Sequence, residues 1–144
     1  MKIKSLGHVV LRVSNIERAE AFYNGVLGLP IVARMEGRPM TFFSLGNHHD
    51  FAVAAIGDDA PKADKAAVGL AHVAFNIGTD LETLKAAKAD LDAAGIETRA
   101  VEHGVTQSLY FSDPDGNGVE VYIDASDSWK RDPQTVAHSE ALVL

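Results

Sequence analysis

The hydrophobic pattern of the chain repeats once. A short apolar run that contains a histidine, residues 6–11, recurs at residues 70–75, so that His72 takes the place of His8 at an offset of 64 (72 minus 8). Both runs are rich in β-branched and large apolar residues, which favours buried strands. Strands that recur at such a spacing indicate two copies of one supersecondary unit.

A helix signal follows each copy of this strand. Apolar residues recur at helical spacing from position 16 and again from position 81, and Gly28 and Gly95 mark the two ends. A polar side chain stands before each start, where its oxygen can accept a bond from a free backbone N–H. The capping candidates are Ser14 or Asn15 for the first helix and Thr79 or Asp80 for the second.

Three short strand-like runs follow each helix. Glycine and proline separate them, and the clearest turn is Asp-Pro-Asp-Gly-Asn-Gly at 113–118. The predicted strands are residues 30–36, 40–45 and 50–56 in the first half and 96–101, 106–112 and 119–123 in the second. We therefore expect an α+β fold in which two βαβββ modules form a cupped mixed β-sheet. The expected organisation is a single domain, 1–144, with module one at 5–57, module two at 69–124 and a C-terminal tail at 125–144.

Three polar residues stand in runs that otherwise predict buried strands. His8 and His72 occupy the same position of the repeat, and Glu120 lies between Val119 and Val121. A carboxylate on a buried strand is costly unless it is paired or bound to a metal. Two imidazoles and one carboxylate are the ligand set of a facial metal triad, which leaves positions open for substrate and dioxygen. The sequence favours a metal site at these three residues over a hydrogen-bonded polar cluster.

The repeat also indicates the number of protein ligands. At the offset of 68 (110 minus 42) that aligns Phe42 with Tyr110, Ala52 takes the place of Glu120 and offers no ligand atom. Three protein ligands are therefore expected. Asp50 lies two residues before Ala52 on the same strand face, and a bulge there would bring in a fourth ligand.

Further polar and aromatic residues are candidates for proton transfer. His48 and His49 precede an apolar strand, where one of them can act as acid/base or both can form a polar turn. Tyr110 lies on the strand before that of the glutamate, where its hydroxyl can donate to a bound oxygen or its ring can pack in the core. His103 belongs to a lid or to the surface, and His138 in the tail is expected to be solvated.

Composition removes several classes of function. The 144 residues carry 13 Lys+Arg against 20 Asp+Glu, a net charge of -7, without a basic block. This balance argues against nucleic acid or an anionic membrane as partner. The absence of cysteine excludes disulfides, thiolate metal sites and cysteine nucleophiles. Because no apolar run approaches the ~20 residues of a membrane helix and the N-terminus lacks a secretory signal, we expect a cytoplasmic protein.

The chain resembles the vicinal oxygen chelate superfamily, which includes glyoxalases, bleomycin- and fosfomycin-resistance proteins and type I extradiol dioxygenases. The resemblance covers nearly all of the chain except the tail. Three stretches carry it: residues 6–9 leading into 19–29, residues 70–75, and residues 113–122. The pattern is most similar to the catalytic half of extradiol dioxygenases, and this likeness implies Fe(II), or Mn(II), held by His8, His72 and Glu120.

The same resemblance implies roles for the remaining candidates. His49 matches the acid/base histidine, with His48 beside it. Tyr110 matches a tyrosine near the substrate hydroxyl, and His103 matches a further histidine of the pocket. Glyoxalase I uses ligands at all four symmetric positions, and Ala52 departs from that pattern.

The expected function is therefore that of a metal-dependent extradiol ring-cleavage dioxygenase. Its partners would be dioxygen and a catecholic aromatic of the biphenyl-diol or catechol type. The alternatives are a glyoxalase-like lyase or isomerase with the same metal site, and a metal-free protein that binds an aromatic drug. Larger extradiol enzymes carry two pairs of modules and this chain carries one. The rest of the pocket wall is expected from a second subunit, in a homodimer, or from the tail with Trp129.

Overall fold

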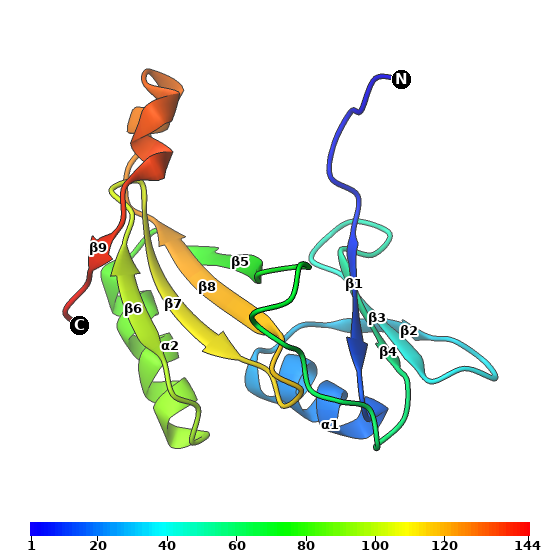
Figure 1. Ribbon diagram of the computed structural model, residues 1–144. Coiled ribbons are helices and arrows are strands. Elements are labelled where there is room, and N and C mark those ends of the chain that lie inside the picture. Colours follow the sequence, from blue (N-terminus) through cyan, green and yellow to red (C-terminus); the bar gives the residue numbers. More distant parts are fainter. The chain divides into compact units, whose positions relative to one another are not determined.

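The element order of the chain repeats a βαβββ unit, as the hydrophobic pattern predicts (Figure 1). The computed structural model describes all residues, 1–144. The first copy comprises β1 (Val9–Val13), α1 (Ile16–Glu20), β2 (Ile31–Arg34), β3 (Met40–Phe43) and β4 (Phe51–Ala55). The second comprises β5 (Val73–Gly78), α2 (Leu81–Ala93), β6 (Arg99–Glu102), β7 (Thr106–Ser112) and β8 (Gly118–Asp124). The predicted α+β class with two βαβββ modules is confirmed.

The chain divides into two compact units, each with one mixed sheet. Unit 1 is Met1–Ala66 together with Asp113–Asn117, and unit 2 is Ala67–Ser112 with Gly118–Leu144. The strand order is β1-β4-β3-β2 in unit 1 and β5-β8-β7-β6-β9 in unit 2. In both, the first strand of the copy pairs in parallel with the last, and the other pairs are antiparallel. No helix of the structure is both long enough and apolar enough to cross a membrane.

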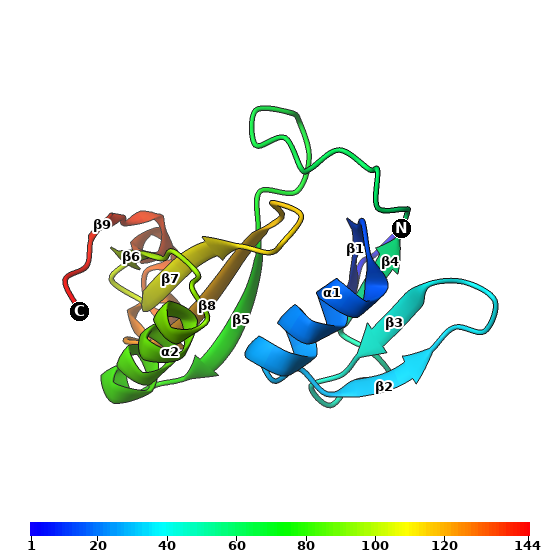
Figure 2. The same ribbon diagram turned by 90° about the horizontal axis from the view of Figure 1, so that it is seen from below.

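In unit 1 the first helix begins at Asn15, whose side chain accepts a bond from the backbone N–H of Arg18. Ser14, the other capping candidate, instead bonds to Asp115. After Glu20 the helix widens into a π-helical segment, Ala21–Val26, that buries Phe22 and Tyr23. Gly28, at φ +73°, ends it as predicted. The helix packs against β3 and β4 (Figure 2).

The turn at residues 113–117 belongs to unit 1 because its carboxylates bond to that unit's first helix. The buried hydroxyl of Tyr23 donates to Asp113 Oδ2 at 2.9 Å. Asp115 Oδ2 accepts the backbone N–H of Ser14 at 2.8 Å. Burial, reinforced by the charge of Asp113, raises the pKa of Tyr23 far above its ordinary value. The sequence predicts the turn, and its side chains add a polar anchor within the aromatic core of unit 1.

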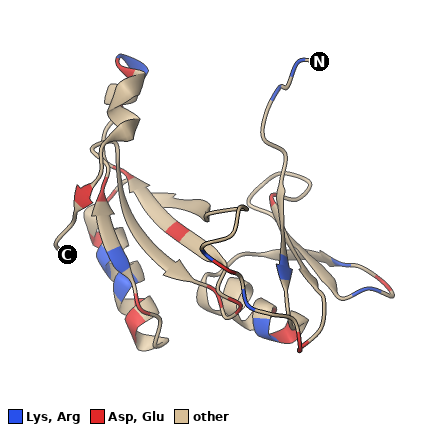
Figure 3. Cartoon of the chain, viewed as in Figure 1, with Lys and Arg blue, Asp and Glu red and all other residues tan.

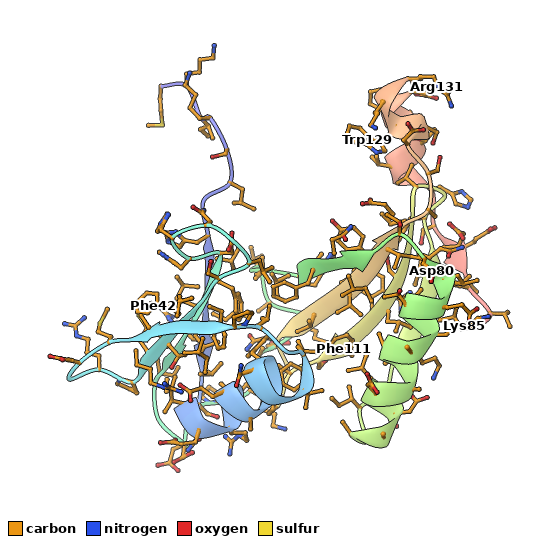
Figure 4. All side chains as sticks on the ribbon, turned by 180° about the vertical axis from the view of Figure 1, so that it is seen from behind. Phe42, Asp80, Lys85, Phe111, Trp129 and Arg131 are labelled. Atoms are coloured by element: carbon orange, nitrogen blue, oxygen red, sulfur yellow. The ribbon has the colours of Figure 1, made fainter.

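In unit 2 the helix α2 covers strands β5, β7 and β8. Asp80 caps it by accepting the backbone N–H of Glu82, and Leu84 and Leu91 form its buried stripe. Figure 4 labels Asp80 at the start of this helix and Lys85 further along it. Beyond the helix, Ile96 donates its N–H to the carbonyl of Leu91, and this capping bond delays the next strand to Arg99.

The tail is ordered rather than merely polar. Two 3-10 turns, Ser128–Lys130 and Pro133–Ala137, precede a short strand β9 (Glu140–Ala141). β9 pairs antiparallel with β6 and covers the edge of the second sheet. Trp129 and Arg131 stand in the first part of the tail (Figure 4).

Candidate functional site

The buried carboxylate of unit 2 is Glu120, in the middle of β8. Only 6% of this residue is exposed. Its Oε2 lies 3.1 Å from Nε2 of His72, which stands just before β5. The parallel pairing of β5 with β8 places Val73 beside Val119 and Ala74 beside Glu120, so the backbone fixes this approach. Two of the three predicted metal ligands therefore meet within unit 2.

No Lys or Arg side chain forms an ion pair with the Glu120 carboxylate. β7 and β8 carry no Lys or Arg, and β8 shows an acidic band at its middle (Figure 3). Among the ion pairs of the structure, Glu120 has the imidazole of His72 as its only partner. A buried carboxylate without a guanidinium or ammonium partner suits a bound cation. An imidazole nitrogen and a carboxylate oxygen at this separation thus fit a divalent metal.

Tyr110 lies directly opposite Glu120 on the neighbouring strand β7. Burial, together with the charge of Glu120, raises the pKa of Tyr110 to about 12. Its ring stands at 86° to that of His72, with the centroids 5.3 Å apart, and Arg99 lies over its face at 4.9 Å. The hydroxyl stays protonated at neutral pH and is held beside the carboxylate.

His103 orients the tyrosine hydroxyl. Its Nδ1 lies 2.8 Å from the backbone carbonyl of His138, which can only accept, so Nδ1 carries the proton of the neutral ring. Its Nε2 then accepts the O–H of Tyr110 at 2.9 Å. The side chain of His138 is exposed, as expected of the tail. The sequence left His103 as a lid residue or a surface residue. In the structure it is half-buried and lies against Tyr110.

The other candidate histidines gather in unit 1. His8 precedes β1, and the backbone N–H of Val9 donates to the carbonyl of Asp50 at 3.1 Å, which brings His8 to the loop before β4. The rings of His8 and His49 lie 4.2 Å apart, and those of His48 and His49 lie 4.6 Å apart. Desolvation, with smaller contributions from His8 and His48, lowers the pKa of His49.

Asp50 and Ala52 are the two residues at or next to β4 that bear on a fourth metal ligand. Asp50 Oδ2 accepts the backbone N–H of Leu45 at 2.7 Å, and backbone bonds lower the pKa of this carboxyl. The side chain therefore holds the loop 44–50 together, which is also why β4 begins one residue later than predicted. Ala52 is fully buried and pairs with Val10. Unit 1 has no carboxylate at the position that corresponds to Glu120.

The sequence-predicted residues thus fall into two groups. His72, Glu120, Tyr110 and His103 form a contiguous cluster in unit 2, and His8, His48 and His49 form one in unit 1. Sequence reasoning missed Arg99 and the carbonyl of His138. The pairing of the two strands that flank Gly104 could have indicated Arg99, because the register of this hairpin places Arg99 opposite Tyr110. No sequence pattern indicated the contact with the tail.

Comparison with known proteins identifies relatives along most of the chain. Biphenyl-2,3-diol 1,2-dioxygenase 3 of Rhodococcus globerulus is 41% identical over 122 residues, which are 83% of this chain and 63% of the relative. Catechol-2,3-dioxygenase of Bacillus subtilis is 33% identical over 132 residues, 88% of this chain and 44% of the relative. The chain thus spans less than two thirds of these relatives.

Relatives with other names match as well. A lactoylglutathione lyase of Neisseria meningitidis is 30% identical and is covered over 86% of its length, and a metallothiol transferase of Lysinibacillus sphaericus is 25% identical. Among solved structures, a glyoxylase/bleomycin resistance protein/dioxygenase domain from Frankia sp. shares the fold, with a TM-score of 0.71 at 17% identity over 85% of this chain and 99% of that one. The sequence model of the Glyoxalase/Bleomycin resistance protein/Dioxygenase superfamily matches residues 5–121, and the chain belongs to this superfamily.

Proposed function

We propose that this protein is a metal-dependent extradiol dioxygenase that opens a catecholic ring next to its two hydroxyls. Its metal would be Fe(II), or Mn(II), and its ligands His8, His72 and Glu120. The substrate class is a biphenyl-diol or a simple catechol, with dioxygen as co-substrate. A homodimer would supply the pocket wall that larger relatives build from a second pair of modules.

One observation carries the proposal: the buried carboxylate of Glu120 lies 3.1 Å from the imidazole of His72, with Tyr110 opposite it on β7. The relatives named biphenyl-2,3-diol 1,2-dioxygenases, at 41% and 38% identity, support the same assignment. So does Ala52, since it leaves the set at two imidazoles and one carboxylate rather than four ligands. Such a set holds the metal on one face and leaves the other face open.

A bound redox-active ion would supply Lewis acidity for the two vicinal oxygens of the substrate and an open position for dioxygen. The residues of the chain do the rest. His49, whose pKa is lowered by its surroundings, is neutral at neutral pH and can take the proton of a substrate hydroxyl. Tyr110 keeps its proton and donates it to His103 Nε2, which holds the hydroxyl beside Glu120. When substrate binds, the hydroxyl would turn from His103 to donate to a substrate oxygen, or would accept a hydrogen bond from a substrate hydroxyl.

A lyase or isomerase reaction is the second candidate, and one observation favours it. The chain covers 86% of the lactoylglutathione lyase relative against 63% of the biphenyl-diol dioxygenase, so its length is closer to that of the lyase. The same ligands would then act as a Lewis-acid site without dioxygen. Activity that persists unchanged without air identifies this alternative.

The experiment that decides between them starts from protein purified under anaerobic conditions and loaded with Fe(II). Adding 2,3-dihydroxybiphenyl or catechol with air should produce a yellow ring-cleavage product and consume oxygen. His49→Ala should keep its iron and lose most of this turnover. Iron-loaded protein that consumes no oxygen with either catechol, or turnover that is unchanged in His49→Ala, contradicts the proposal.

A further inference from the structure

We propose that His8, His48 and His49 form a second metal site, contained in unit 1, that binds a divalent ion of the zinc or copper type through three imidazoles. The site uses neither His72 nor Glu120, but it shares His8 with the proposed iron set. Ion binding to these three histidines can be tested without reference to the reaction that the chain catalyses.

The three imidazoles already converge. One ligand nitrogen of each lies within 4.8 Å of the other two. In a tetrahedral zinc site with Zn–N bonds of 2.0–2.1 Å, neighbouring nitrogens are roughly 3.4 Å apart, so the rings need to close by little more than an ångström. His8 and His48 are exposed and His49 is half-buried, so this closure needs only side-chain rotation.

The backbone around the three residues is fixed in advance. Asp50 Oδ2 accepts the backbone N–H of Leu45 at 2.7 Å, and the Ser44 hydroxyl donates to the carbonyl of Asn47 at 2.5 Å. The bond between Val9 N–H and the Asp50 carbonyl, 3.1 Å long, ties the strand that follows His8 to this loop. The ring of Phe42, a residue of β3 labelled in Figure 4, meets that of His49 edge-on at 5.3 Å and limits its rotation. Binding of a metal would therefore order the three histidine side chains and would leave the backbone as it is.

One histidine also has a partner that orients its ring. His48 Nδ1 lies 3.1 Å from the side-chain oxygen of Asn47. Because an amide oxygen only accepts, Nδ1 carries the proton and Nε2 is the free ligand atom. Metal-binding histidines commonly donate their second nitrogen to an oxygen in this way.

The donor set determines which ion is favoured. The nearest carboxylate, Asp50, is engaged with backbone N–H groups and Ser44, so the site offers nitrogen alone. Imidazole donors suit zinc, copper and nickel, and affinity for such ions exceeds that for Fe(II) in the general order of divalent metals. Because His8 is also a ligand of the proposed iron set, an ion bound here would withdraw it from that set. Zinc at this site is thus expected to oppose iron loading.

The test uses the metal-free 144-residue chain with His72→Ala and Glu120→Gln together, which removes two ligands of the proposed iron site. Titration with Zn²⁺ in a calorimeter should show one ion bound per chain. Adding His48→Ala to this background should weaken binding about a hundredfold, and Asn47→Ala about tenfold. The matched control is His138→Ala, an exposed histidine of the tail, which should leave the affinity unchanged.

The possible outcomes separate the two proposals. Zinc binding that depends on His48 in the doubly substituted background supports the tri-histidine site even if no dioxygenase activity is ever found. A background protein that binds no zinc overturns the site, as does binding that neither His48→Ala nor Asn47→Ala weakens. An equal loss in His138→Ala would show that the effect is unspecific and would also overturn it.

Discussion

The buried bond between Tyr23 and Asp113 should be one of the larger single polar contributions to stability. The hydroxyl lies 2.9 Å from Asp113 Oδ2, Tyr23 is fully buried, and Asp113 is 5% exposed. In Tyr23→Phe the ring still packs against Phe43 and Phe51, so the change removes the hydrogen bond and little else.

The expected loss of unfolding free energy depends on the hydrogen bonds that the Asp113 carboxylate retains in Tyr23→Phe. Its Oδ1 retains the N–H groups of Asp115 and Asn117, and its Oδ2 retains the side-chain amide of Asn117 at 2.8 Å. One donor out of four is lost from a buried carboxylate, for which about 2 kcal/mol is expected. For a chain of 144 residues this corresponds to a fall in Tm of about 6 °C.

Urea unfolding of wild type and Tyr23→Phe measures this cost, with the slope against urea as a check that the unfolded state is unchanged. The matched control is Tyr122→Phe, on β8, whose hydroxyl takes part in no hydrogen bond of the structure. A loss in Tyr23→Phe of less than about 0.5 kcal/mol, or one no larger than in the control, refutes the assignment of residues 113–117 as an anchor of unit 1.

Three further outcomes are expected. Asp80→Ala should lower the free energy of unfolding by about 1 kcal/mol in urea, because the cap of α2 is lost, whereas an unchanged midpoint would contradict the capping role. The hydrogen bond from Arg34 lowers the pKa of Glu20 below 4.5, so its stabilising contribution is present above that pH and is lost as the pH falls through the lower folded value. The free energies of unfolding of wild type and Glu20→Gln should therefore converge in acid. A difference that stays constant down to pH 2 would contradict the stabilising role of the Glu20 charge. In the iron-loaded protein Tyr110→Phe should lower kcat about a hundredfold with iron content unchanged, as followed by oxygen uptake, and full activity would remove the tyrosine from the mechanism.

Much of the fold was predictable because it repeats. The equivalence of His8 and His72 predicts two copies of one βαβββ unit, and Asp80, one of the two capping candidates, and Gly95 mark the ends of α2. Element boundaries were less predictable, since they depend on bonds between distant residues. The capping bond from Ile96 shortens β6 in this way.

The candidate site was predictable in its residue types but only partly in its contacts. The strand register that pairs Tyr110 with Glu120 follows from the turn at residues 113–118. The bond from His103 to the carbonyl of His138 does not, because it depends on how the tail folds back. The ring contacts of His8 with His49 arise from the parallel pairing of β1 with β4, which joins positions 42 residues apart (51 minus 9) and leaves no local pattern in the sequence.

The most direct test of the central claim is the iron content of the protein after anaerobic loading with Fe(II) and removal of free metal. The account predicts about one iron per chain in wild type and a loss of most of it in Glu120→Ala, since this change removes the only carboxylate of the proposed set. Asp124→Ala, which changes the exposed acidic residue at the end of the same strand, should keep its iron. Iron content that is equal in wild type and Glu120→Ala would contradict the account.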